Sequence, residues 1–286
     1  MSERVFIVGA GQVGRGLYRA FRGSGIEVLG LHGRRHTAWT TSTGAIPAAV
    51  SDANTIILAV RDNQIDDAIS ELVDRRPQNH APRLATGTVV LHTSGSAEPQ
   101  LLPSLFERGL GGGTFHPLIP FANPDRIPEL LKKAWIGIDG DDLARSASRR
   151  LAGHIGARTL EIPAGGKALY HAAAVMSSNF PVVLAAIATE MFTALGVPER
   201  SAQQAVNGLM DAAVSNLAEH SPAEAMTGPV VRGETDTLMR HLGALRNHAE
   251  ARAVYKRLSL AALSIAAQRG VAPETIAEMQ RVLLLR

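Results

Sequence analysis

The chain has 286 residues, of which 45% are hydrophobic and 19% charged, and its formal net charge is +3. This length allows two domains with a large core, and the ordinary composition argues against a disordered chain. The near balance of charge argues against nucleic acid and anionic membranes as partners, and the lack of cysteine excludes disulfides and thiolate-bound metals. We therefore expect a cytoplasmic protein.

The first motif is a glycine-rich turn between an apolar run and a helix. Residues 5–8 are apolar, and the helical pattern begins with Leu17 and Phe21. Between them lie glycines with the spacing of a dinucleotide fingerprint, in which one glycine turns the chain, another lets backbone approach a pyrophosphate, and a third lets helix pack against strand. The predicted pyrophosphate-binding residues are Gly9, Gly11, Gln12, Val13 and Gly14. A ligand-free glycine turn is the alternative.

A second apolar run, at residues 26–31, leads to Arg34 and Arg35, with no acidic residue between Leu29 and Arg35. In a dinucleotide fold this position meets the adenosine ribose, where an acid selects NAD and an arginine accommodates the 2′-phosphate of NADP. The sequence therefore favours NADP(H) as cofactor. Two solvated surface arginines remain the alternative.

The apolar runs continue at residues 55–60 and 88–92, with a helical pattern at 64–73 between them. This alternation predicts a doubly wound parallel sheet, in which ligands bind at the carboxyl ends of the strands. We expect Val60, Arg61, Thr93 and Ser94 at the cofactor cleft. Residues 111–121, 135–138 and 157–162 suggest further strands, and residues 142–155 a helix.

The pattern changes to helices alone from residue 166 onward. Helices are predicted near residues 167–195, 198–217, 235–247, 250–269 and 273–284. The sequence thus predicts an α/β chain: an N-terminal Rossmann domain at residues 1–163 and an all-α domain at residues 164–286. The apolar stretch at residues 180–187 is too short to span a bilayer.

The first long helix carries the side chains best suited to chemistry. Lys167, His171 and Ser178 lie within about 40° of one another on a helical wheel, and Asn179 lies near the edge of that stripe. Such a face could bind a carbonyl and relay a proton, because burial and neighbouring charges readily change the pKa of lysine and histidine. A solvated lysine and a packed histidine are the alternative.

Two further candidates lie in loops. His116 precedes a proline at the end of a predicted strand, and it could contact substrate or donate a proton. A histidine satisfied by backbone groups is the alternative. Arg232 lies in a Gly/Pro loop and could clamp a substrate carboxylate, or it could pair with Glu224 or Glu234. No histidine spacing suggests a metal site.

Five segments of the chain together resemble a known family. They are residues 8–14, 91–95, 114–118, 167–175 with Ser178 and Asn179, and 227–233. The chain is similar to Rossmann-like proteins with the C-terminal domain of unknown function 2520, in the superfamily of 6-phosphogluconate dehydrogenase, pyrroline-5-carboxylate reductase and ketopantoate reductase. The resemblance implies an NADP-dependent oxidoreductase fold and a homodimer formed through the helical domain.

The resemblance also implies roles for single residues. Lys167 is similar in place to the catalytic lysine of hydroxyacid dehydrogenases, although His171 stands where they have asparagine. The Phe115-His116-Pro117 stretch resembles the Gly-His-Pro of prephenate dehydrogenases, with Phe115 in place of the glycine. Thr227 falls at the substrate loop of pyrroline-5-carboxylate reductase.

The sequence thus predicts NADP-dependent hydride transfer to or from a C=O or C=N bond of a small, carboxylated metabolite. The catalytic candidates are Lys167, His171 and His116, and the substrate-binding candidates are Ser178, Asn179, Thr227 and Arg232. The alternative is a non-catalytic NADP-binding sensor or interaction protein.

Overall fold

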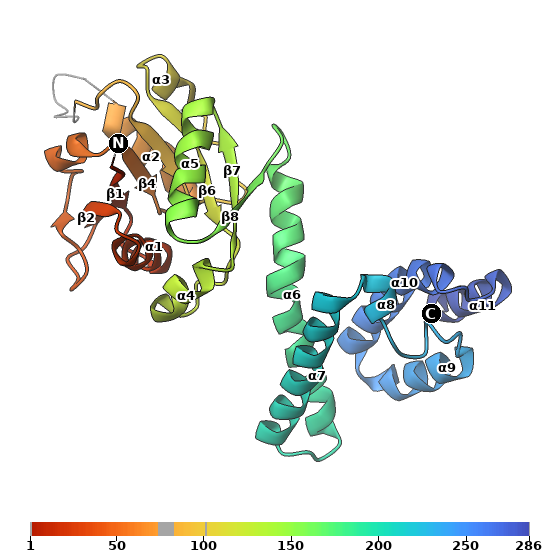
Figure 1. Cartoon of the computed structure of the whole chain (residues 1–286). Coiled ribbons are helices and arrows are strands. Elements are labelled where there is room, and N and C mark those ends of the chain that lie inside the picture. Colours follow the sequence, from red (N-terminus) through yellow and green to blue (C-terminus); the bar gives the residue numbers. More distant parts are fainter. Residues whose placement is uncertain (1, 74–82, 101, 286) are drawn as a thin grey trace. The chain divides into compact units, whose positions relative to one another are not determined.

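The computed structural model describes residues 2–73, 83–100 and 102–285 (Figure 1). The chain divides into two compact units, the first comprising residues 1–180 and the second residues 181–286. The division falls inside one long helix, next to Pro181, which cannot donate an intrahelical hydrogen bond. The predicted domain boundary between residues 163 and 164 stays a prediction.

The first unit is built on an eight-stranded sheet of order β3-β2-β1-β4-β5-β6-β7-β8. The strands are β1 (Arg4–Val8), β2 (Glu27–Gly33), β3 (Ser42–Thr43), β4 (Thr55–Leu58), β5 (Val89–His92), β6 (Gly111–Pro117), β7 (Trp135–Gly140) and β8 (Arg158–Glu161). The order from β3 to β6 is that of a dinucleotide-binding sheet, which confirms the predicted Rossmann fold. The two-residue strand β3 was not predicted, because it is too short to show periodicity.

The sheet departs from the predicted parallel arrangement at one edge. Strand β7 pairs antiparallel with β6, and β8 pairs parallel with β7, so both run against the other strands. An antiparallel neighbour needs no long crossover helix, and the connection between β6 and β7 holds a 3-10 turn (Pro124–Arg126) and the short helix α4 (Ile127–Leu131). Residues of β6 and β7 therefore face each other as cross-strand pairs.

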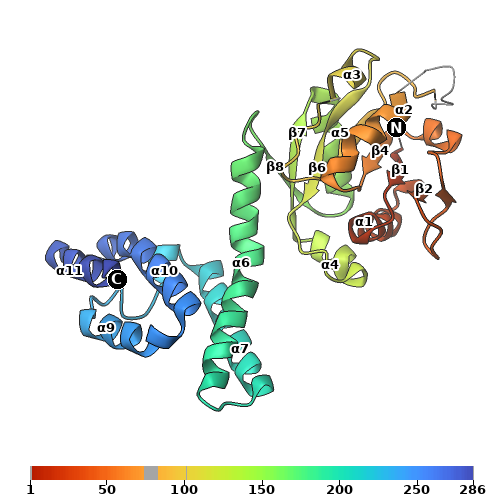
Figure 2. The ribbon, with the colours of Figure 1, turned by 180° about the vertical axis from the view of Figure 1, so that it is seen from behind.

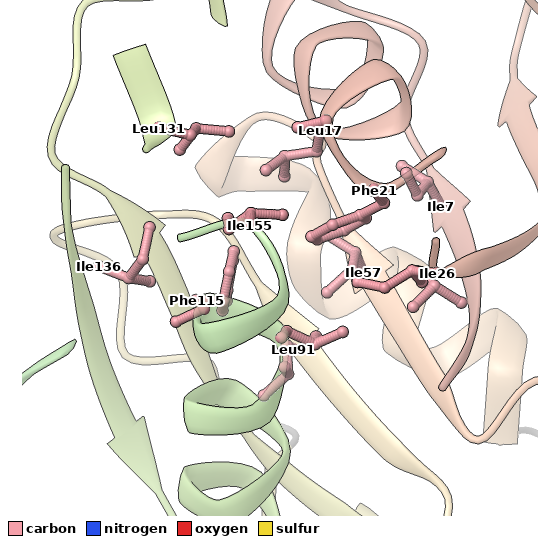
Figure 3. Close-up of a cluster of buried hydrophobic side chains, with 14 of the residues drawn as sticks. Ile7, Leu17, Phe21, Ile26, Ile57, Leu91, Phe115, Leu131, Ile136 and Ile155 are labelled. Atoms are coloured by element: carbon pink, nitrogen blue, oxygen red, sulfur yellow. The ribbon is translucent and has the colours of Figure 1, made fainter. Parts of the chain in front are cut away.

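Helices cover both faces of the sheet in the first unit. One core packs α1 (Gln12–Gly23), α4 and α5 (Asp142–His154) on one face, and Phe21, Phe115 and Ile136 are among its members (Figure 3). The other core packs α2 (Ile65–Val73) and α3 (Leu102–Phe106) on the opposite face. Alternate side chains of each strand enter alternate cores, which explains the continuous apolar runs in the sequence.

Helix α6 (Lys167–Ala194) begins in the first unit and continues into the second. Its 28 residues have a mean hydropathy of 1.6 over the most apolar stretch, so by length and composition alone it could cross a membrane. One such helix is weak evidence for a membrane protein, because an apolar helix in a soluble fold meets the same test.

The second unit continues with helices only. They are α7 (Glu199–Glu219), α8 (Pro222–Ala225), α9 (Thr235–Ala244), α10 (Ala249–Gln268) and α11 (Pro273–Leu284). Helices α9, α10 and α11 bury a common core that includes Leu238, Ala266 and Met279 (Figure 2). The predicted helices are confirmed, whereas the short α8 was not predicted. Several apolar side chains stay exposed on α7 and α10, and the predicted homodimer stays a prediction.

The core around Phe115 yields a stability prediction. This side chain is fully buried, and its ring centre lies 6.1 Å from that of Phe21. We expect Phe115→Ala to lower the free energy of unfolding by about 3–5 kcal/mol, because it leaves a cavity in a close-packed core. Denaturant unfolding followed by tryptophan fluorescence checks this, since both tryptophans, Trp39 and Trp135, lie in the first unit.

Phe106→Ala is the control, because Phe106 is 43% exposed. It should cost less than about 1.5 kcal/mol. Equal losses in the two variants would contradict the assignment of Phe115 to the centre of the core.

Candidate functional site

The glycine turn after β1 has the shape of a dinucleotide cradle. Gly9 adopts a φ of +116°, which side chains rarely allow, and a Cβ atom there would collide with the carbonyl oxygen of Ala59. A Cβ at Gly14 would collide with the carbonyl oxygen of Gly9. The open face lies at Gly11, where an added Cβ would meet no heavy atom within 4 Å. The turn is closed toward the sheet and open toward a ligand.

Helix α1 begins at this open face. Gly11 is its N-cap and provides no side-chain acceptor, so the first-turn N–H groups are available to an anion. A cavity of about 470 Å³ adjoins the turn. Its lining includes the predicted cofactor residues Gly9, Gly11, Arg34, Arg35, Val60 and Arg61. These groups fit a phosphorylated dinucleotide, with two arginines exposed beside β2 for an additional phosphate.

The other predicted cofactor residues take different places. Val13 packs against the first core, and Thr93 donates a hydrogen bond of 3.4 Å to the carbonyl oxygen of Leu58. The Ser94 hydroxyl is buried and accepts the N–H of Ala97 at 2.9 Å. Their predicted contacts with the cofactor stay predictions. Asp67 and Glu71 also line the cavity, and neither was predicted from the sequence.

A buried polar row crosses the sheet beneath the start of α6. The strand registers align His92 of β5 with Thr114 of β6, and Thr114 with Asp139 of β7. Lys167, only 3% exposed, lies over this row. Its Nζ atom donates to Thr114 Oγ1 at 2.7 Å and lies 3.3 Å from both His92 Nε2 and Asp139 Oδ2. Lys167 thus fastens the first turn of α6 to three strands.

The next row on the same face carries a histidine–tyrosine pair. His116 lies opposite Gly137 in the antiparallel register, two residues beyond the first row on each strand. Its Nδ1 atom lies 2.8 Å from the Tyr170 hydroxyl. A Cβ atom at Gly137 would collide with that hydroxyl, so the glycine provides the room that Tyr170 needs.

His171, which follows Tyr170 in α6, lies beside the His116–Tyr170 pair. Its ring centre lies 5.9 Å from that of His116. A Cβ atom at Gly95 would lie 2.6 Å from His171 Nδ1 and 2.7 Å from His116 Cε1, so both rings approach the Gly95 backbone closely. The His171 Nδ1 atom is buried and has no hydrogen-bond partner among the described residues.

The surroundings keep His116 and Tyr170 uncharged at neutral pH. Burial, followed by the neighbouring His171 and Lys167, lowers the pKa of His116 to about 4. Burial, followed by the charge of Asp139, raises the pKa of the Tyr170 phenol. Burial also lowers the pKa of Lys167, while Asp139 opposes that effect. At neutral pH the His116–Tyr170 pair therefore carries no net charge.

This pair opens into a second cavity, of about 970 Å³, in the first unit. Its lining comprises Gln12, residues 116–122, Leu160 and a face of α6 from Tyr170 to Asn179. The predicted site residues His116, His171, Ser178 and Asn179 all belong to it. Gln12 directly follows the Gly11 N-cap, so the cofactor turn and this cavity adjoin in the same unit.

The structure does not bring every predicted residue to this cavity. Lys167 is absent from its described lining, because its side chain points into the polar row. Thr227 and Arg232 belong to the second unit. Arg232 forms an ion pair with Glu234, which was the alternative to binding a substrate carboxylate. Its Nε atom lies 2.5 Å from Glu234 Oε1, and its Nη2 atom lies 3.2 Å from Oε2. The described residues contain no cluster of three or more metal-ligating side chains.

Three residues of the site, Tyr170, Asp139 and Gly137, were not predicted from the sequence. Tyr170 could have been found, since it lies one helical turn after Lys167 and next to His171, on the same side of the helix. Asp139 and Gly137 carry no such signal. Their place depends on the antiparallel pairing of β7 with β6, which the sequence did not predict.

The two halves of the sequence match known family models. Residues 2–117 match the Rossmann-like domain, and residues 134–262 match the domain of unknown function DUF2520. The chain thus carries a Rossmann-like domain followed by a DUF2520 domain, as in the family that its sequence resembles. No match was found among curated proteins.

Several solved structures share the fold. A Bacteroides fragilis protein provisionally assigned as an NADP oxidoreductase is 18% identical with a TM-score of 0.70, covering 92% of this chain and 98% of its own. A pyrroline-5-carboxylate reductase from Streptococcus pyogenes is 15% identical with a TM-score of 0.60, covering 98% and 99%. A reductive aminase from Aspergillus terreus, in complex with NADPH and ethyl levulinate, is 16% identical with a TM-score of 0.57, covering 99% and 93%.

The polar row predicts that acid destabilises the protein. Burial, followed by Lys167 and His116, lowers the pKa of His92 from 6.5 to about 3. Between these pH values the unfolded chain binds a proton that the folded protein does not, so stability present above pH 6.5 is lost as the pH falls. In His92→Gln the fall in unfolding free energy should be smaller, as measured by denaturant unfolding at a series of pH values.

The control for this measurement is His154→Gln, which removes an exposed imidazole on α5. It should leave the pH dependence as it is in the parent protein. The same pH dependence in His92→Gln and the parent would refute the assignment of acid sensitivity to the row.

Proposed function

We propose that the protein is an NADP(H)-dependent oxidoreductase that acts on the C=O or C=N bond of a small metabolite. One observation carries the proposal: the neutral His116–Tyr170 pair lines a cavity that starts at Gln12, the residue after the dinucleotide turn. The provisional NADP oxidoreductase, the pyrroline-5-carboxylate reductase and the reductive aminase among the structural neighbours support it.

The cradle of Gly9, Gly11, Arg34 and Arg35 would hold the cofactor. Bound NADPH supplies a hydride to carbon in the direction of reduction. The Tyr170 hydroxyl then donates its proton to the substrate oxygen or nitrogen, and the resulting phenolate accepts a hydrogen bond from the His116 Nδ1–H group at 2.8 Å until a proton from solvent restores the phenol.

In this scheme Lys167 positions the proton donor and does not itself transfer the proton. Its Nζ atom is held by Thr114 and Asp139. That anchor places Tyr170, one turn further along α6, over Gly137 and against His116. His171 and Asn179 line the cavity and are available to orient the substrate.

Arg34 is expected to select the cofactor. Arg34→Ala should weaken NADPH binding at least about tenfold, or about 1.4 kcal/mol, because the 2′-phosphate loses a charged partner. NADH binding should change little. Fluorescence titration of both cofactors against both proteins measures the two effects.

Arg108→Ala, which removes an exposed arginine outside the cofactor cavity, is the matched control and should bind both cofactors as the parent does. Equal affinities of the parent protein for NADPH and NADH would refute the 2′-phosphate assignment.

Tyr170 is expected to carry the proton transfer. Tyr170→Phe should lower kcat by about 100-fold to 10,000-fold in reduction of a responsive carbonyl or imine, because it removes the general acid. NADPH binding should persist. The measurement is NADPH consumption across a panel of such compounds, with cofactor titration of the same protein.

The second unit provides a matched control, since His241 and Tyr255 form a similar pair at 2.8 Å. Tyr255→Phe should keep full turnover. If the parent binds NADPH but consumes it with no compound, a non-catalytic NADP-binding sensor becomes the better description. Full turnover in Tyr170→Phe would exclude this tyrosine as the acid.

A further inference from the structure

The cavity beside the His116–Tyr170 pair is lined by apolar side chains, neutral polar side chains and histidine. Among the described residues that line it, none is lysine, arginine, aspartate or glutamate. Its polar side chains besides the pair and His171 are the amides of Gln12 and Asn179 and the hydroxyls of Ser177 and Ser178. These groups offer neutral hydrogen bonds only.

The remaining wall of the cavity is apolar. Residues 117–122, with the sequence Pro-Leu-Ile-Pro-Phe-Ala, form one stretch of it, and Leu160 of β8 contributes another. Ala173, Ala174 and Val175 of α6 complete the apolar surface. Such a wall binds alkyl or aryl groups by excluding water from both surfaces.

Two charged groups that act on His116, Lys167 and Asp62, have hydrogen-bond partners within the protein. The Lys167 ammonium is held by Asp139 and Thr114. The Asp62 carboxylate accepts a hydrogen bond from the Ser96 hydroxyl at 3.0 Å. A carboxylate entering this cavity would lose its hydration and meet no lysine or arginine in the described lining.

From these observations we infer that the substrate enters the cavity as an uncharged ketone, aldehyde or imine with an apolar substituent, and not as the oxo acid that the sequence suggested. This inference rests on the proposed function. For a ketone, one hydride equivalent from NADPH and one proton convert C=O into a secondary alcohol and leave NADP⁺.

Three related 4-oxo compounds test the inference. Levulinate carries a carboxylate, levulinamide is its nearly isosteric uncharged amide, and ethyl levulinate adds an apolar group. The amide should exceed the acid in kcat/KM by at least about tenfold, because only the charge differs. The ester should match or exceed the amide because of the apolar wall. NADPH consumption gives kcat/KM, and calorimetric titration of the protein with NADP⁺ present gives binding.

A designed cation in the cavity sharpens the test. Ser178→Lys places an ammonium on the lining face of α6, and Ser178→Gln adds comparable length without charge. Relative to Ser178→Gln, the lysine variant should improve the kcat/KM and the affinity for levulinate severalfold and leave those for levulinamide nearly unchanged.

The outcomes separate the inference from the proposed function. Equal or tighter binding of levulinate than of levulinamide overturns the inference, as does an equal response of levulinate to the lysine and glutamine variants. Binding of neither neutral compound overturns it as well. Preferential binding of the neutral compounds without any NADPH consumption supports the inference and counts against the oxidoreductase.

Discussion

The burial of the Lys167 ammonium is the constraint on which the site depends. A charge that is 3% exposed is tolerable only where hydrogen-bond acceptors surround it, and Thr114, Asp139 and His92 provide them from three adjacent strands. The helix that carries Lys167 is thereby held in one register on the sheet. Every later side chain of its first turns, including Tyr170 and His171, takes its place from that register.

The reversed strand β7 makes this arrangement possible. Because β6 and β7 are antiparallel, Thr114 faces Asp139 and His116 faces Gly137, so two successive rows on one face offer first a carboxylate and then a gap. Residues three apart on α6 match residues two apart on the strands, since both separations are about 5–7 Å. Lys167 fills the first row and Tyr170 the second. A side chain larger than hydrogen at residue 137 would exclude this fit.

The proposed proton transfer depends on the scarcity of charged side chains around the cavity that the His116–Tyr170 pair lines. Burial holds the pKa of His116 low and that of Tyr170 high, so their shared proton stays in a neutral pair. The cofactor cavity, with its arginines, concentrates charge on the other side of the glycine turn. In the proposed function, one sheet edge provides an arginine-lined site for a phosphorylated dinucleotide and, next to Gln12, a substrate site without lysine, arginine or carboxylate among its described lining residues.

The sequence by itself determined the Rossmann fold, the helical continuation and the glycine turn, because these depend on periodicity and on local backbone requirements at Gly9 and Gly14. It also identified His116, His171, Ser178 and Asn179, which the structure places around one cavity. Only the tertiary structure decided that Lys167 turns into the sheet, that Tyr170 meets His116, and that Arg232 pairs with Glu234. Helical spacing places residues on a face, but the direction and partner of a long side chain depend on strands distant in sequence, and their antiparallel register leaves no mark in the local pattern.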